Sequence, residues 1–243
     1  MGKILWRPDN IHKTHMMEFM GRINNLHDLQ IQSYEELHHW SINNIPDFWK
    51  EIWNQSDIIH SKPYTSIIDN LQKMPGAKWF PGSRLNFAEN LLRFRDDRIA
   101  IYAKAENLPL RSITYNELFN QVEALAHSLK SIGVKKGDRV AGFIPNIPEA
   151  VIAMLATSAI GAIWSSASPD FGVKGVLDRF KQIEPKIVFT SDGYFYNGKK
   201  FDSLEKLNDI LKKLPSVEKT IIINQIDNQK RSFSPGLNLP ALT

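Results

Sequence analysis

The sequence predicts an α/β fold with a doubly wound, mainly parallel sheet, preceded by a small helical cap. Residues 138–172 give the clearest sign, because they follow the order strand, helix, strand. The apolar run at 140–144 does not alternate with polar residues, which is typical of a parallel strand buried on both faces. From residue 91 onward, similar runs alternate with stretches of helical periodicity, the order found in parallel sheets. Residues 1–84 show no strand alternation and form the expected cap.

The composition limits the classes of protein to consider. The chain has 243 residues, 42% of them hydrophobic, and no cysteine. The lack of cysteine excludes disulfides, thiol nucleophiles and cysteine-based zinc sites, and it favours a cytoplasmic protein. A net charge of +4 with both signs interspersed does not indicate nucleic acid as a partner. We expect no membrane partner, because no secretory signal is visible and the apolar helix at 147–161 is too short to cross a bilayer.

Residues 1–84 are expected to form short helices that pack on a further part of the chain. Ser33 and Glu36 give the capping-box pattern that opens a helix, and another helix is expected at 48–53. Residues 56–75 lack periodicity and are expected to form an extended wrapping segment. Five of the six tryptophans lie in this part, namely Trp6, Trp40, Trp49, Trp53 and Trp79. Large aromatic side chains at helical spacing indicate core or docking surface.

The α/β part is expected to span residues 85–224 and to begin with a pair of strands. These strands are expected at 99–103 and 111–113. Thr114 then caps a helix with Glu117 three residues later, and a glycine at 133 ends it.

The strand–helix–strand unit follows. After the strand at 140–144, Asn146 and Glu149 predict a second capping box. The helix at 147–161 is apolar on nearly every face, so it must be covered all round. A strand at 162–164 completes the unit.

The remaining elements alternate between helix and strand, in the order helix 173–183, strand 187–190, helix 202–214 and strand 220–223. Asp202 and Glu205 are expected to open the second of these helices. Residues 225–243 lose periodicity and are expected to form an irregular tail.

Familiar catalytic and metal-binding motifs are missing. The sequence contains neither of the glycine-rich phosphate loops GxxxxGKS/T and GxGxxG, and no GxSxG nucleophile motif. The histidines lie almost wholly in the first sixty residues, where His38 and His39 are adjacent and cannot share a helix face. We therefore predict no catalytic residue and no metal site in this chain.

Two polar segments remain as candidate ligand sites. Residues 165–172 form a turn-forming loop at the expected carboxyl end of a parallel strand, where open α/β sheets bind ligands. Residues 194–200 are expected to form a loop after another strand. They combine aromatic rings, a glycine and two ammonium groups, which suit stacking on a base and neutralising a phosphate.

Three stretches of the sequence are distinctive, namely WFPGSRLNFAENLL (79–92), SITYNEL (112–118) and GAIWSSASPDFGVKGVLDRFKQIEPKIVFTSDGYFYNGKK (161–200). Together they closely resemble the acetoacetyl-CoA synthetase family, a branch of the adenylate-forming superfamily. The likeness runs from residue 6 to about 224, and the cap resembles the N-terminal extension of acetyl- and acetoacetyl-CoA synthetases. The resemblance implies that acetoacetate is activated with ATP and Mg²⁺ to an acyl-adenylate, and that the acyl group then passes to CoA.

The resemblance also implies an incomplete enzyme. The sequence lacks the family's Gly/Ser/Thr-rich triphosphate loop, its Tyr-Gly-x-Thr-Glu motif, its ribose-binding Asp and its catalytic Lys domain. We therefore expect an N-terminal portion that is inactive alone, binds no cofactor tightly, has the missing C-terminal part as its partner and self-associates through the exposed seam. The alternatives are a fragment of an acetyl- or propionyl-CoA synthetase, a non-catalytic truncated protein that binds a nucleotide or a partner, and a purely structural fragment.

The same resemblance implies which residues meet CoA. In the related acetyl-CoA synthetases, a loop of the Arg-Gly-Gly-Arg type contacts the 3′-phosphate ADP of CoA, and it is similar to residues 196–199. Lys199 keeps the second cation, whereas Tyr196 replaces the first. A loop beside the pantetheine arm is similar to residues 168–170, for which a tight strand-to-helix turn is the alternative interpretation. The candidates are Tyr196, Asn197, Gly198, Lys199, Lys200, Ser168, Pro169 and Asp170.

Overall fold

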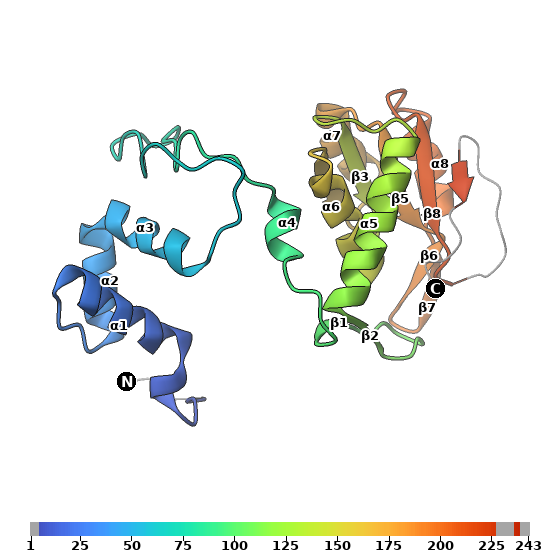
Figure 1. Ribbon diagram of the computed structural model, residues 1–243. Coiled ribbons are helices and arrows are strands. Elements are labelled where there is room, and N and C mark those ends of the chain that lie inside the picture. The colour runs from blue at the N-terminus through green and yellow to red at the C-terminus, as the bar shows by residue number, and fades with distance from the viewer. Residues whose placement is uncertain (1–4, 227–235, 239–243) are drawn as a thin grey trace. The chain divides into compact units, whose positions relative to one another are not determined.

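The computed structural model describes residues 5–226 and 236–238, and the chain divides into two compact units (Figure 1). The first unit is Met1–Leu85 and the second is Asn86–Thr243. Each unit has its own hydrophobic core, so each is described by itself.

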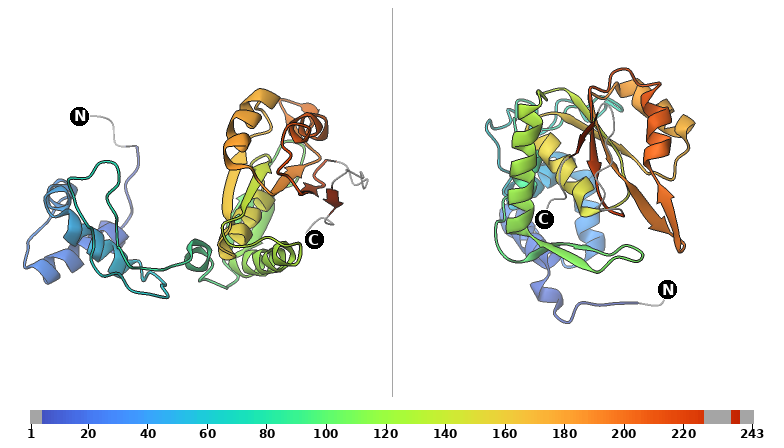
Figure 2. Two further views of the ribbon diagram at one scale, coloured as in Figure 1. Left: turned by 90° about the horizontal axis from the view of Figure 1, so that it is seen from above. Right: turned by 90° about the vertical axis from the view of Figure 1, so that its right-hand side faces the viewer.

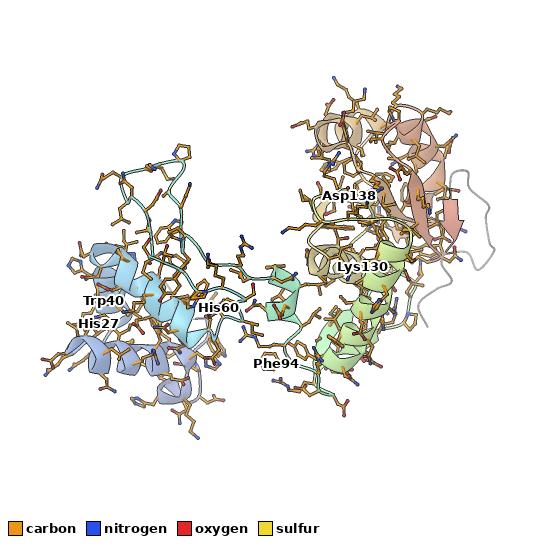
Figure 3. All side chains as sticks on the ribbon, turned by 45° about the horizontal axis from the view of Figure 1, so that its top comes forward. His27, Trp40, His60, Phe94, Lys130 and Asp138 are labelled. Carbon is orange, nitrogen blue, oxygen red and sulfur yellow. The ribbon has the colours of Figure 1, made fainter. Side chains whose placement is uncertain are left out.

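The first unit is built from a 3-10 turn and three helices, Ile11–Lys13, α1 (His15–His27), α2 (Tyr34–Asn43) and α3 (Ile45–Gln55). Ser33 and Glu36 form the expected capping box, because the Ser33 hydroxyl accepts from the Glu36 amide and the Glu36 carboxylate accepts from the Ser33 amide, both at 3.2 Å. The core is centred on Phe19 and the fully buried Ile23. His27 packs its ring on Trp40 at 5.1 Å between centroids (Figure 3).

The segment after α3 turns back on itself. Antiparallel bridges join Lys62 to Arg84 and Ile68 to Trp79. Aromatic side chains of this segment pack on α3. The ring centroids of Trp53 and Phe80 are 4.5 Å apart, and those of Trp49 and Trp79 are 5.8 Å apart. Trp40, Trp49, Trp53 and Trp79 therefore act as packing groups of this small unit, whereas Trp6 is 78% exposed.

The second unit contains the expected doubly wound parallel sheet. Its strands are β3 (Arg139–Phe143), β4 (Ile163–Ala167), β5 (Ile187–Ser191), β8 (Lys219–Ile223) and β9 (Gly236–Asn238). They run in the order β4-β3-β5-β8-β9, and every neighbouring pair is parallel. This confirms the predicted α/β class.

Helices cover both faces of the sheet (Figure 2). One face packs against α5 (Tyr115–Ser131) and α6 (Pro148–Ala159), and the other against α7 (Val173–Ile183) and α8 (Leu204–Leu211). Successive residues of one strand serve opposite faces, since Val188 packs with α7 and α8 while Ile187 and Phe189 pack with α5 and α6. This burial on both faces explains the apolar runs in the sequence.

Smaller elements flank the sheet. The helix α4 (Phe87–Leu91) precedes β1 (Ile99–Ala103) and β2 (Arg111–Thr114), which pair antiparallel as expected. Thr114 and Glu117 form the predicted capping box on α5, and Gly133 follows the helix at a φ of +92°.

Two predicted helix starts are wrong. The helix α6 begins at Pro148 behind Ile147, without a side-chain cap, because the Glu149 carboxylate accepts a 2.8 Å hydrogen bond from Arg111 instead of turning back to the backbone. The helix α8 begins at Leu204 rather than at 202, because Asp202 ends a strand and accepts from the Leu204 amide at 2.7 Å.

Three predicted irregular segments contain strand residues. The strand β4 extends to Ala167, so the loop expected at 165–172 begins only at Ser168. Residues 194–200 belong to a hairpin of β6 (Gly193–Tyr196) and β7 (Lys199–Asp202) rather than to a loop. Within the expected irregular tail, β9 pairs with β8, and three residues are too few to leave a periodicity in the sequence. The rest of that tail, 227–235 and 239–243, lies outside the described residues.

Candidate functional site

The carboxyl ends of the parallel strands define one edge of the sheet in the second unit. The chain leaves β3 toward β4 on one side, whereas β5 lies on the other side of β3. This is a switch in winding direction, and the loops at such a point form the usual ligand crevice of an open α/β sheet. The loops after β3, β4 and β5 therefore lie at the edge of the sheet where a ligand is expected.

The loop after β4 carries three of the predicted residues and is held from two directions. The Ser168 hydroxyl donates to Asp170 at 3.0 Å and accepts from the Asp170 amide at 3.3 Å. The Lys206 ammonium of α8 donates to the carbonyl of the buried Pro169 at 3.1 Å. Asp170 is an exposed residue, and Ser168 holds both its carboxylate and its backbone amide.

The β6–β7 hairpin carries the other five predicted residues. Tyr196 pairs with Lys199 across the hairpin, and Asn197 and Gly198 form the two-residue turn at φ values of +50° and +72°. These left-handed φ values are typical of an Asn-Gly turn between two strands. Residues 196–200 are all exposed, so the turn presents a phenol and two ammonium-bearing side chains to solvent.

A hydrogen bond brings the two predicted segments together. The Tyr194 hydroxyl donates to Asp170 at 2.9 Å, and the Tyr194 ring stacks on Phe201 of the opposite strand at 5.3 Å. Burial, followed by the contact with the Asp170 carboxylate, raises the pKa of Tyr194 to about 12. The loop after β4 and the hairpin therefore form one connected surface.

Glu106, in the loop between β1 and β2, was not among the residues predicted from the sequence. One of its carboxylate oxygens accepts from the Asn197 amide at 3.0 Å, and the other accepts from the Gly198 amide at 2.9 Å. The Asn-Gly pair in the sequence signals the turn, but no local pattern indicates that a glutamate about ninety residues earlier binds it.

Asp192 lies at the end of β5 and supports the same edge of the sheet. It is only 3% exposed, and Oδ1 accepts from the amides of Gln225 at 2.8 Å and Ile226 at 3.1 Å. Its carboxylate therefore binds the backbone of the segment that follows β8.

Asp138 lies at the amino end of β3, away from this edge, and is labelled in Figure 3. It accepts from the Lys135 amide at 2.9 Å and from the Lys186 ammonium at 3.2 Å. The backbone donor and then the Lys186 side chain lower the pKa of this carboxyl. This contact is structural, because it joins the turn before β3 to the residue before β5.

A small pocket of about 30 Å³ opens between the β1–β2 loop and the start of α6. Lys104, Arg111 and Asn146 contribute its polar groups. A pocket of this volume has room for ordered water but is small for a substrate. The pocket therefore does not by itself define a ligand.

In the part of the chain that the structure describes, no three side chains among His, Cys, Asp and Glu are grouped so that they could hold a metal ion. No helix there has the length and apolar character needed to cross a bilayer.

The chain matches two protein families. Residues 87–239 match the AMP-binding enzyme family, and residues 34–91 match the family described as acetyl-coenzyme A synthetase N-terminus. The second unit thus coincides closely with the first of these matches.

Curated relatives extend the similarity over most of the chain. It is 42% identical to the acetoacetyl-CoA synthetase of Macaca fascicularis, over 94% of this chain and 34% of the relative. It is 44% identical to that of Mus musculus, over 91% and 33%. A malonamoyl-CoA synthetase of Penicillium aethiopicum is 36% identical over 98% and 34%.

A solved structure supports the same relationship. The acetoacetyl-CoA synthetase from Streptomyces lividans superposes with a TM-score of 0.89 at 38% sequence identity, covering 97% of this chain and 37% of that one. The chain therefore spans about a third of the length of the relatives that it matches.

Proposed function

Because the chain belongs to the AMP-binding enzyme family, we propose that it forms the N-terminal portion of an ATP-dependent acetoacetate–CoA ligase. Such an enzyme joins acetoacetate to AMP with release of pyrophosphate, and then transfers the acetoacetyl group to the thiol of CoA. The observation that carries the proposal is the continuous similarity to acetoacetyl-CoA synthetases across both units of the chain.

The names of the relatives narrow the class of acid. Acetoacetyl-CoA and malonamoyl-CoA differ in the terminal group, but both have a carbonyl carbon one methylene away from the activated carboxyl group. We therefore expect a substrate with a carbonyl group at position 3. Acetate and propionate lack this group, which makes an acetyl- or propionyl-CoA synthetase the alternative to test.

The residues of the β6–β7 hairpin are proposed to meet the 3′-phosphate ADP part of CoA. Lys199 and Lys200 supply ammonium groups beside a turn with two backbone donors, and Tyr196 supplies an exposed ring next to them. One exposed ammonium–phosphate contact contributes about 0.5–1 kcal/mol, and stacking on a ring adds about 1–3 kcal/mol. These sums lie below the roughly 8 kcal/mol of micromolar affinity, so the 243 residues alone should bind CoA weakly.

The loop of Ser168, Pro169 and Asp170 is proposed to border the pantetheine arm. Its support is the hydrogen bond from Tyr194, which connects this loop to the hairpin. Lys206 fixes Pro169, so this border is held in place before a ligand arrives.

ATP, Mg²⁺ and acetoacetate are proposed as substrates of the longer enzyme. Bound Mg²⁺ would neutralise the triphosphate during attack by the carboxylate. This chain contributes the sheet edge and the hairpin to that arrangement. Because positioning provides much of the catalysis in phosphoryl-group chemistry, the 243 residues alone are expected to be inactive.

We also propose a cytoplasmic location and self-association of the isolated chain. The absence of cysteine supports the first, and exposed apolar side chains such as Phe87, Phe94 and Ile163 support the second. Sedimentation over a range of concentrations tests the association, because a strictly monomeric chain at high concentration would contradict it.

The decisive test of the function uses a polypeptide that contains these residues and matches the relatives in length. Acid-dependent exchange of pyrophosphate into ATP measures adenylation, and thioester formation from CoA measures the second step. Acetoacetate should support both steps better than malonamate, acetate or propionate. Greater activity with acetate or propionate would favour the alternative ligase, and no activity with any acid would favour a non-catalytic protein.

A further inference from the structure

The Asn197–Gly198 turn is built to bind an anion. Both residues have left-handed backbone conformations, and their adjacent amides converge on one carboxylate. Successive backbone N–H groups of this kind form a nest for negatively charged oxygens. Each amide takes a different oxygen of Glu106, which is the arrangement that two oxygens of a phosphate group would also provide.

The anion in this nest belongs to the chain itself. Glu106 lies at the tip of the β1–β2 loop, whereas the turn belongs to the separate β6–β7 hairpin. Glu106, Asn197 and Gly198 are all exposed, so the contact can open without disturbing either hydrophobic core. An exposed contact between two loops is easily reversed, because it gains little free energy over hydration.

The surroundings favour exchange of one anion for another. Lys199 and Lys200 follow the turn directly, so two positively charged residues come immediately after the amides that Glu106 occupies. A phosphate dianion carries more negative charge than a carboxylate. It would accept charge-assisted hydrogen bonds from the Asn197 and Gly198 amides in place of Glu106. It would also be repelled by Glu106 for as long as that carboxylate stays in place.

We propose that Glu106 is an internal competitor that occupies the anion site of the hairpin turn and is displaced when a phosphate monoester binds there. That the phosphate monoester is the 3′-phosphate of CoA rests on the proposed function. A competitor differs from a residue that merely supports the turn, because removing its charge changes the phosphate affinity in the opposite direction. Removing the charge of a competitor strengthens phosphate binding, whereas removing a support weakens it.

The test compares the 243-residue chain with its Glu106→Gln variant by backbone amide NMR. Inorganic phosphate should shift the Asn197 and Gly198 amide signals at about two- to fivefold lower concentration in the variant, a change typical of one exposed charge contact. Glu123→Gln is the control, because it removes the same charge from an exposed position on α5. It should behave like the unmodified chain.

Three results would overturn the proposal. The first is an unchanged phosphate response in Glu106→Gln, and the second is a weaker one. The third is a collapse of the Phe195 and Lys200 amide chemical shifts toward unfolded values in the variant without ligand. Glu106 would then be needed to form the hairpin.

CoA and dephospho-CoA, which lacks the 3′-phosphate, separate this proposal from the proposed function. If CoA shifts the hairpin signals more than dephospho-CoA does, and Glu106→Gln lowers the CoA concentration needed, both proposals are supported. If CoA acts equally on both forms of the chain, the competitor role fails while the CoA site stands. If the variant responds to inorganic phosphate at lower concentration but CoA does not shift the hairpin signals of either form, the competitor role stands and the CoA assignment fails.

Discussion

The hydroxyl of Tyr194 donates a 2.9 Å hydrogen bond to the carboxylate of Asp170 and so joins the β6–β7 hairpin to the loop after β4. Tyr194→Phe removes this bond but keeps the ring that stacks on Phe201. We expect a loss of about 0.5–1.5 kcal/mol in the free energy of unfolding, measured with urea. Asp170→Asn keeps an acceptor oxygen and should cost less. Equal losses in the two variants would show that the charge of Asp170 dominates the contact.

The raised pKa of Tyr194 makes stability sensitive to alkaline pH. Tyrosine is neutral when protonated, and burial followed by Asp170 raises its folded pKa from 10.0 to about 12. The stabilisation is therefore complete below pH 10 and is lost as the pH rises toward 12. Ultraviolet titration should show one tyrosine ionising late, and Tyr194→Phe should abolish that step. A late step that persists in Tyr194→Phe belongs to another tyrosine.

Charge reversal at the hairpin tests the proposed CoA contact. In the longer ligase, Lys199→Glu should raise the KM for CoA several-fold and leave adenylation of acetoacetate unchanged, because the contact concerns only the thiol substrate. Lys213→Glu, at an exposed position after α8, is the control for the change in net charge. Equal slowing of both steps by Lys199→Glu would show that the hairpin is structural.

The isolated 243 residues should not form an acyl-adenylate. They span about a third of the relatives' length, and adenylation depends on groups that position the triphosphate and the acid together. Exchange of labelled pyrophosphate into ATP in the presence of acetoacetate measures this step directly. Exchange above background with the purified chain would disprove the expectation.

The Arg111–Glu149 ion pair should matter more than the surface ion pairs. The Glu149 side chain is 11% exposed, so Arg111→Met leaves a mostly buried carboxylate without its partner, at a cost of about 1–3 kcal/mol. Lys212→Met breaks the exposed pair with Asp209 and should leave unfolding nearly unchanged. Adding Glu149→Leu to Arg111→Met should restore most of the lost stability. No recovery in the double variant would indicate that Arg111 acts through its packing.

The sequence was sufficient to predict the strands and helices that have a strong hydrophobic period. The run at 140–144 and the stripe of α5 are examples, because burial on two faces or on one stripe imposes the pattern directly. The capping prediction at Asn146 was wrong because a contact that is distant in the sequence decided the outcome. A glutamate three residues after a capping residue can bond to the backbone or to a distant arginine, and only the fold places Arg111 beside Glu149.

The candidate site could be predicted only in pieces. Both predicted segments follow strands of the expected sheet, which is why their residue types drew attention. Their connection through Tyr194 and Asp170 depends on strand order and on the hairpin, and the Asn197–Gly198 pair that signals this hairpin was interpreted as a loop. Glu106 joins the turn from a separate two-stranded sheet, so no local pattern could have found it. The roles of these residues toward CoA remain predictions.

The all-parallel order of the central sheet also has a consequence for how quickly the chain acquires its structure. Neighbours such as Val140 and Ile187 are far apart in the sequence, and each pairing must wait for an intervening segment to bring the strands together. Closing such loops costs entropy before any contact repays it, so high-contact-order sheets assemble slowly. The capped helix α5 depends mainly on local contacts and can form early. During synthesis, the apolar strands of this unit are therefore exposed to aggregation until the last central strand arrives.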